Sequence, residues 1–254
     1  MARSRLLERL EAGRASRGAW LFLGSPDASE LLGRAGFDAL IIDHEHSPGG
    51  IETAVHQMRA IRAAGDATIL ARVGSNDTAA IKRLLDCGAE GLLLPNVESA
   101  EEARAFVADC RYPPRGRRGT HLSVSRAAGW GFDSEAYYRD SGRLLLAAMI
   151  ESEKGVQAIP RISRVEGLGM LFLGPGDLAA SIDRMGRYED PAVVDLVREA
   201  ETATLVGGLP LGGALVPGDT ARAAFARGYR FATVGNDVSM LRQAATALTA
   251  EGVA

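Results

Sequence analysis

The chain has 254 residues, of which 24% are charged and 46% hydrophobic, a composition typical of a folded globular protein and too apolar for a disordered one. Its formal net charge is −3, and its basic residues are scattered apart from a short run at 115–118, which excludes nucleic acid as the main partner. No apolar run is long enough to span a bilayer, so we also expect no membrane partner. The two cysteines show no metal-site spacing, and we expect both to be reduced in a cytoplasmic protein.

The predicted elements begin with a helix in residues 1–13, where leucines recur at helical spacing. The segments between the later strands also show helical periodicity, as in Ile81, Leu84 and Leu85. The strands themselves are continuous and apolar, which indicates a parallel sheet buried on both faces. Eight such short, β-prone runs follow one another at residues 19–23, 39–43, 68–73, 91–95, 144–150, 169–173, 209–216 and 230–234.

Repeated strand–helix units form either an open doubly wound sheet or a closed barrel, and eight units favour the barrel. The turn at 24–27 after the first run lacks the glycine pattern of a dinucleotide site. No shift in composition divides the chain into parts. We therefore predict an α/β fold in which residues 1–254 form a single (β/α)8 TIM barrel with an extra N-terminal helix.

A long segment between the fourth and fifth predicted strands interrupts this rhythm. Residues 112–140 contain Pro113, Pro114 and several glycines and arginines. Ordered loops of this length are often functional, and the alternative is a flexible surface insertion.

Two acidic residues follow predicted strands at the end where barrel enzymes place their catalytic groups. Glu151 comes directly after the fifth strand, and Asp177 follows the sixth. Carboxylates from neighbouring strands are suitable ligands for a hard divalent cation such as Mg2+ or Mn2+. The alternative is that one of them, Asp177 above all, caps a helix.

Arg72 and His46 lie at the ends of two further strands. Arg72 has no acid beside it in sequence, so its partner is either a ligand oxygen, such as that of a 2-oxo acid, or a salt bridge within the fold. His46 is predicted to be an acid/base that Asp43 or another acid orients. The spacing of His44 and His46 is only weak evidence for zinc.

Six motifs follow one another along the chain: GFDALIIDHEH at 36–46, Arg72, KRLLDCGA at 82–89, RYPP at 111–114 with Arg118-Gly119, Ile150-Glu151, and FLGPGDL at 172–178. In this order they resemble the hydroxy-oxo-heptanedioate aldolase family, a group of class II pyruvate aldolases related to 2-keto-3-deoxy-rhamnonate aldolase and macrophomate synthase. The resemblance covers nearly the whole chain.

The resemblance implies a metal-dependent cleavage or formation of a carbon–carbon bond between a pyruvate-type enolate and an aldehyde. It implies that Glu151 and Asp177 hold Mg2+, Mn2+ or Co2+, that Arg72 polarises the 2-oxo acid, and that His46 moves the proton. It further implies a homo-oligomer, commonly a hexamer built as a trimer of dimers. The histidine would be supported by Asp43 and by Asp86, the latter from a neighbouring subunit. The residues expected to line the substrate pocket are Trp20, Phe172, Gly174, Pro175, Gly176 and Leu215, with Phe172 matching an aromatic beside the aldehyde.

Departures from the family pattern leave other reactions open. Met149 stands where such aldolases often carry Gln, Gly176 replaces an Ala, and His44 replaces a smaller residue. One branch of the family resembles a siderophore citrate synthase that joins an acetyl group to oxaloacetate, and this remains the alternative function. A barrel that only binds a metabolite is a second alternative. A Schiff-base route is not expected, because Lys82 and Lys154 fall in helical stretches.

Overall fold

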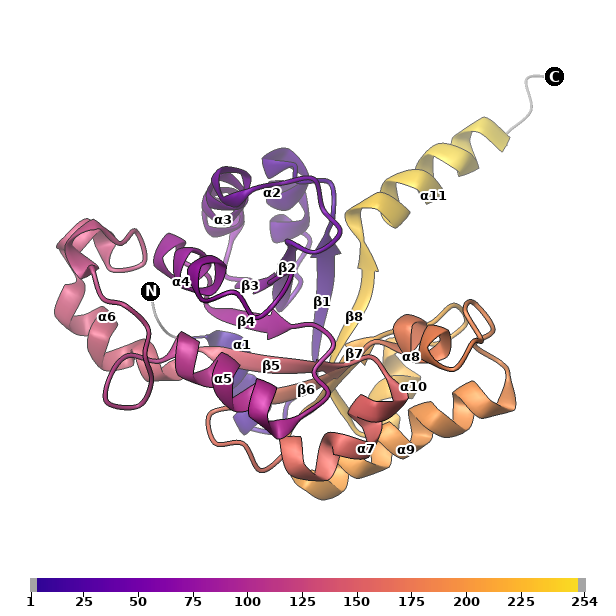
Figure 1. The fold of residues 1–254 in the computed structure, drawn as a ribbon. Coiled ribbons are helices and arrows are strands. Elements are labelled where there is room, and N and C mark those ends of the chain that lie inside the picture. The colour runs from indigo at the N-terminus through magenta and orange to yellow at the C-terminus, as the bar shows by residue number, and fades with distance from the viewer. Residues whose placement is uncertain (1–3, 251–254) are drawn as a thin grey trace.

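A computed structural model describes residues 4–250 of the chain, and within that range eight parallel strands form a closed barrel in sequence order (Figure 1). Each strand pairs with the next, and the last pairs with the first. The predicted (β/α)8 barrel is therefore confirmed. The strands are β1 (Ser16–Leu21), β2 (Ala39–Asp43), β3 (Thr68–Arg72), β4 (Gly91–Leu94), β5 (Leu145–Ile150), β6 (Met170–Leu173), β7 (Leu211–Ala214) and β8 (Tyr229–Asn236).

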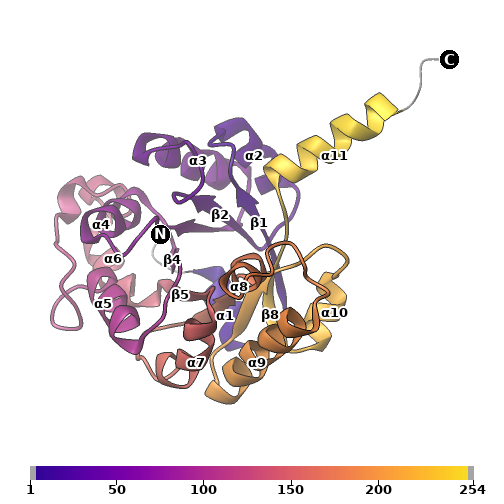
Figure 2. The same cartoon turned by 45° about the vertical axis from the view of Figure 1, so that its right-hand side comes forward.

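Helices alternate with the strands and surround the sheet, as Figure 2 shows. They are α1 (Arg5–Glu11), α2 (Pro26–Arg34), α3 (Ile51–Ala64), α4 (Thr78–Cys87), α5 (Ala100–Cys110), α6 (Ser134–Asp140), α7 (Glu153–Ile162), α8 (Pro175–Ser181), α9 (Pro191–Gly207), α10 (Ala221–Ala226) and α11 (Asp237–Ala250). Three short 3-10 turns are η1 (Leu122–Val124), η2 (Gly129–Gly131) and η3 (Ser141–Arg143). The prediction that residues 1–254 form one domain stays a prediction, and residues 1–3 and 251–254 lie outside the described part.

The alternation of side chains along each strand divides the core into two layers. In β2, Ala39 and Ile41 belong to the layer inside the barrel, while Leu40 and Ile42 pack outward against the helices. The inner layer also receives Leu6 and Leu10 of α1, both buried. This confirms the extra N-terminal helix, whose leucines add to the core inside the barrel; burying each stabilises the fold by about 1.5–3 kcal/mol.

The segment 112–140 joins α5 to β5, so it belongs to the end of the barrel where strands begin. It has a small core of its own, which includes Tyr112 and Tyr137. Arg118, only 1% exposed, donates to Tyr137 Oη over 3.0 Å and to Asp86 Oδ1 over 2.6 Å. The segment is therefore packed against α4, and it lies opposite the end where strands finish.

The last helix leaves the barrel. In both views α11 extends away from the strands (Figures 1 and 2), and all its residues from Leu241 to Ala250 are exposed. Leu241 and Leu248 are 63% and 72% exposed. Among the described residues, no helix combines the length and the hydropathy that a membrane crossing requires.

Candidate active site

The predicted site residues converge at the mouth of the barrel where the strands end. Two adjoining cavities open there, of about 290 Å³ and about 480 Å³, and both are lined by His46, Glu151 and Asp177. The larger cavity adds polar residues, including Glu45 and Asn96. The smaller cavity is lined by ten of the twelve predicted residues, namely Trp20, His46, Arg72, Glu151, Phe172, Gly174, Pro175, Gly176, Asp177 and Leu215.

Asp43 and Arg72 form a buried ion pair beneath the smaller cavity. They end β2 and β3 and are partners in the strand register. Arg72 Nε donates to Asp43 Oδ1 over 2.5 Å, and Arg72 Nη1 lies 2.8 Å from Glu45 Oε2. The guanidinium carbon lies 4.7 Å from the centre of the Trp20 ring. These contacts fix the side chain, which is 5% exposed, and leave Nη2 without a partner among residues 4–250.

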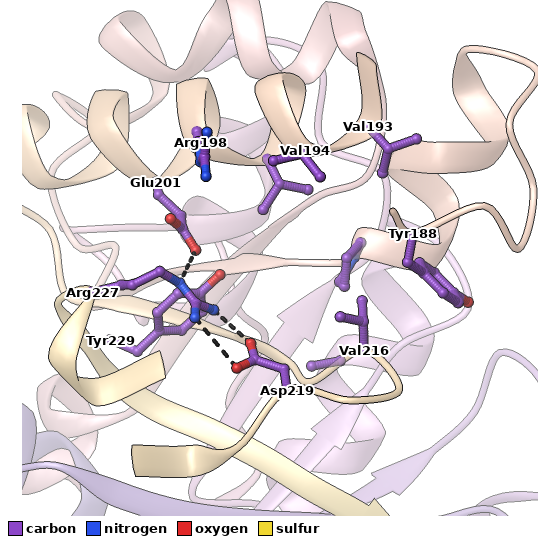
Figure 3. Close-up of a pocket in the computed structure, with 12 residues that line it drawn as sticks. Tyr188, Val193, Val194, Arg198, Glu201, Val216, Asp219, Arg227 and Tyr229 are labelled. Carbon is purple, nitrogen blue, oxygen red and sulfur yellow. Dashed lines mark hydrogen bonds and ion pairs between the residues drawn. The ribbon is translucent and has the colours of Figure 1, made fainter. Parts of the chain in front are cut away.

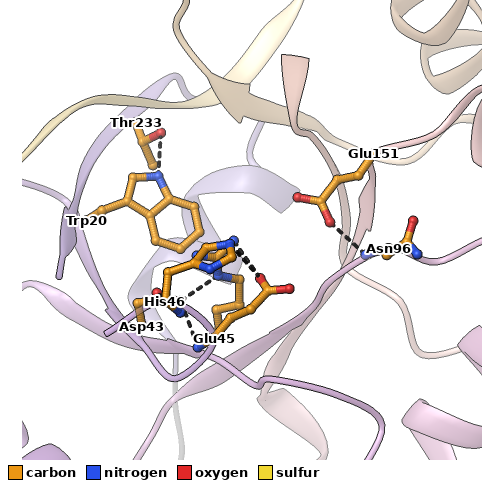
Figure 4. A network of polar contacts seen from close by, with 8 residues as sticks. Trp20, Asp43, Glu45, His46, Asn96, Glu151 and Thr233 are labelled. Carbon is orange, nitrogen blue, oxygen red and sulfur yellow. Dashed lines mark hydrogen bonds and ion pairs between the residues drawn. The ribbon is translucent and has the colours of Figure 1, made fainter. Parts of the chain in front are cut away.

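His46 is carried by a loop whose backbone is held by the same carboxylate. Asp43 accepts hydrogen bonds from the backbone N–H groups of Glu45 and His46, over 3.3 Å and 2.8 Å. We expected Asp43 or another acid to orient His46: Asp43 contacts only its backbone, and the imidazole Nε2 lies 3.9 Å from Glu45 Oε2 (Figure 4). The His46 side chain is 67% exposed, so few neighbouring side chains hold it. Its position beside the cavity therefore depends on the backbone of the loop.

Asp177 lies close enough to Glu151 for its negative charge to act on the Glu151 carboxyl. Glu151 Oε2 accepts a 2.7 Å hydrogen bond from the backbone N–H of Asn96, and the residue is 7% exposed. Burial raises the pKa of Glu151 to about 7, and the negative charges of Asp177 and Glu45 act in the same direction. Neither acid caps a helix, because Gly174 precedes α8 and Ser152 precedes α7. The alternative interpretation of Asp177 as an N-cap is therefore wrong.

An aromatic wall closes the smaller cavity. Trp20 meets Phe172 edge to face, with ring centres 5.7 Å apart, and its indole N–H donates to Thr233 Oγ1 over 3.0 Å. Met149 is also buried here, at 2% exposure, where its thioether offers only a weak acceptor. This wall is suited to an apolar group such as a methyl.

Asp86 does not meet His46 within one chain. It lies in the last turn of α4, at the opposite end of the barrel from the cavities. Its side chain is 29% exposed, as a solvated helix residue would be, but its Oδ1 is ion-paired with the buried Arg118.

Sequence patterns missed two residues that hold the site together. Glu45 was within a quoted motif, but nothing in the sequence showed that it contacts Arg72. Asn96 follows the fourth strand with a left-handed φ of 47°, and its backbone N–H, not its side chain, contacts Glu151. His44 lines a separate cavity that His46 does not line, so the two histidines do not form a metal pair in the described chain.

Comparisons with known proteins agree with this geometry. The model of the HpcH/HpaI aldolase/citrate lyase family matches residues 17–244. The chain is 36% identical over 236 residues to 5-keto-4-deoxy-D-glucarate aldolase of Shigella dysenteriae, covering 92% of this chain and 91% of the relative. It is also 36% identical over 241 residues to 4-hydroxy-2-oxo-heptane-1,7-dioate aldolase of Escherichia coli, covering 95% and 92%.

Solved structures show the same architecture. A family protein from Burkholderia cenocepacia superposes with a TM-score of 0.91 at 35% identity, covering 98% of both chains. Citrate synthase SbnG superposes with a TM-score of 0.83 at 27% identity, covering 96% of both. The chain belongs to the HpcH/HpaI aldolase/citrate lyase family and is a carbon–carbon lyase.

Proposed function

We propose that this enzyme is a divalent-metal-dependent class II aldolase acting on 4-hydroxy-2-oxo acids, with a pyruvate-type 2-oxo acid and an aldehyde as the two partners. The observation that carries the proposal is the meeting of Arg72, His46, Glu151 and Asp177 around one cavity. The names of the aldolase relatives at 36% identity support it. The similarity to SbnG leaves citrate synthesis as the alternative, while a barrel without catalysis is set aside because the chain is a lyase.

The residues present fit a divalent cation. Glu151 is a buried carboxylate beside a second acid, and no residue within 4–250 is found to bond its Oε1. A bound cation would compensate this concentration of negative charge. Among the described residues, no group of three or more His, Cys, Asp or Glu side chains is arranged around a common point. Glu151 and Asp177 would therefore supply two hard oxygen ligands and leave positions open for water and substrate.

The chain's own residues divide the reaction between them. When bound, the metal would act as a Lewis acid that lowers the cost of negative charge on the ketone oxygen. Arg72, through its unpaired Nη2, donates to a substrate oxygen that gains charge as the enolate forms. His46 takes the proton of the C4 hydroxyl when the bond between C3 and C4 breaks, and returns it in the reverse reaction. Trp20 and Phe172 exclude water from the side of the cavity where the methyl or methylene carbon lies.

The enzyme is also proposed to work as a homo-oligomer, a hexamer built as a trimer of dimers, in the cytoplasm. Its two cysteines are unpaired, as expected of a cytoplasmic protein. Two features of the single chain support an oligomer: His46 is largely exposed, and α11 presents Leu241 and Leu248 to solvent. A second copy of this chain would cover the apolar face of α11, and a neighbouring subunit would bring Asp86 toward His46.

The first prediction concerns the metal. Removing divalent metal with EDTA followed by dialysis should abolish cleavage of 4-hydroxy-2-oxo acids, and Mg2+, Mn2+ or Co2+ should restore it. Asp177→Asn should weaken metal binding strongly, because a hard cation loses a charged ligand. A panel of these acids, together with oxaloacetate plus acetyl-CoA, would separate aldolase from citrate synthase activity. Full activity after chelation would contradict the metal's role.

The second prediction follows from the raised pKa of Glu151. In the metal-free fold this carboxyl holds its proton up to about pH 7, against a usual pKa of 4.5, so it lowers the free energy of unfolding as the pH rises from 4.5 to 7. Glu151→Gln should not show this fall. The free energy of unfolding of the variant, relative to wild type, should therefore rise by up to about 3 kcal/mol when the pH is raised from 5 to 8. Urea unfolding with EDTA measures it, with the exposed Glu166→Gln as control. If the free energies of unfolding of Glu151→Gln and wild type differ by the same amount at pH 5 and pH 8, the raised pKa of Glu151 is contradicted.

The third prediction concerns Arg72. Arg72→Lys should lower kcat/KM at least about 100-fold, the scale of losing one oxyanion donor. A lysine cannot reach Asp43 and Glu45 together while also facing the substrate. Arg104→Lys on the exposed surface of α5 serves as control. Near-native turnover of the Arg72 variant would make the arginine a structural residue only.

The fourth prediction concerns assembly. Light scattering should show an oligomer, and turnover should decline as dilution produces monomer. Leu241→Asp and Leu248→Asp should shift the protein to smaller species with lower turnover, since they place charge on an apolar contact. Val206→Asp on α9, where Val206 is 84% exposed, should change neither property. A monomer with undiminished turnover would exclude any role of Asp86 in catalysis.

A further inference from the structure

We propose that Glu45 is a positioning residue that couples the anion-binding Arg72 to the acid/base His46. The inference rests on the aldolase function proposed above. One oxygen of Glu45 makes both contacts: Oε2 lies 2.8 Å from Arg72 Nη1. The same Oε2 lies 3.9 Å from His46 Nε2, and Figure 4 shows Glu45 and His46 side by side. Glu45 therefore lies between the group that receives negative charge and the group that moves the proton.

The local backbone directs Glu45 to this place. Asp43 accepts from the N–H groups of both Glu45 and His46, so the chain turns sharply after β2. The backbone of Gly74 lies close against this turn, since a Cβ there would lie 3.0 Å from the carbonyl oxygen of His44. The position of the Glu45 carboxylate is therefore set by the same turn that presents His46.

Charge gives this contact its function. Arg72 is desolvated, and its Nε is already paired with Asp43. Glu45 takes Nη1, which prevents the guanidinium from rotating toward Glu151 and Asp177 and keeps Nη2 available to the substrate. At 26% side-chain exposure, Glu45 also borders the larger cavity.

Other sites in the molecule carry less. In the cavity between α9 and β7, Arg227 is bonded to Glu201 and Asp219 (Figure 3), and Arg198 also lines the cavity. Arg227 therefore neutralises both acids of this cavity, and most of its other lining residues are apolar.

The test compares Glu45→Gln with Glu98→Gln in the metal-loaded enzyme. Glu98 borders the same cavity but is bonded to Ser152 and Lys154, away from Arg72. Glu45→Gln should lose at least about tenfold in kcat, because misplacing catalytic groups by about 1 Å can cost up to 100-fold. Its fold, followed by circular dichroism, should be retained, and Glu98→Gln should stay within about twofold of wild type. If Glu45→Gln does not fold, Glu45→Asp, which withdraws the carboxylate by one methylene, takes its place with the same expected loss.

A double-mutant cycle with Arg72→Lys identifies a residue that acts through another. If Glu45 acts through Arg72, the double variant should be within about threefold of Arg72→Lys alone. Losses that multiply in full, or a Glu45 variant within about threefold of wild type, would overturn the proposal. A wild type and a Glu98→Gln control that both lack turnover would instead overturn the aldolase function, and this inference with it.

Discussion

The candidate site depends on one buried ion pair, between Asp43 and Arg72. Register in the sheet places the two residues side by side at the ends of β2 and β3, where Asp43 is 1% and Arg72 5% exposed. Removing Arg72 would leave the buried Asp43 carboxylate without its cation, at a cost of about 3–5 kcal/mol. The same carboxylate shapes the loop that carries His46. One acid thus fixes both the anion-binding guanidinium and the acid/base, and a change at Asp43 would disturb both together.

Across the cavity from Arg72, the wall formed by Glu151 and Asp177 is negatively charged and requires a positive partner. Glu151 and Asp177 concentrate negative charge where burial already raises the pKa of Glu151 to about 7, so this wall favours a cation. In the proposed function, a substrate between the walls would meet a bound cation on one side and the guanidinium of Arg72 on the other. A 2-oxo acid, with two oxygens on adjacent carbons and an enolisable carbon beside them, has the matching arrangement. Because Arg72 ends β3, Glu151 follows β5 and Asp177 lies in the first turn of α8, these groups are positioned before the substrate arrives.

The barrel and the strand-end candidates for the site could be predicted because both follow from local pattern, whereas the pocket residues were implied by the family resemblance. Eight apolar runs determine the strands, and the polar residues directly after them fall at one mouth. The contacts of Arg72 could not be predicted from the sequence. Its pairing with Asp43 depends on strand register, and its pairing with Glu45 depends on the turn of a loop. The same limit applied to Asp86, whose partner Arg118 is 32 residues away in a segment with no regular pattern. The outward direction of α11 also left no trace, because its apolar residues are compatible with packing on its own barrel.

If this site forms the enolate of a pyruvate-type acid, the enzyme should exchange the methyl protons of pyruvate for deuterium in D2O. Proton NMR follows the loss of the methyl signal with no aldehyde present, so enolisation is observed apart from carbon–carbon bond cleavage. Exchange should require both a divalent metal and the intact protein, and Asp177→Asn should slow it at least about tenfold through weakened metal binding. If pyruvate binds to the metal-loaded enzyme but keeps all its methyl protons, no enolate forms at this site.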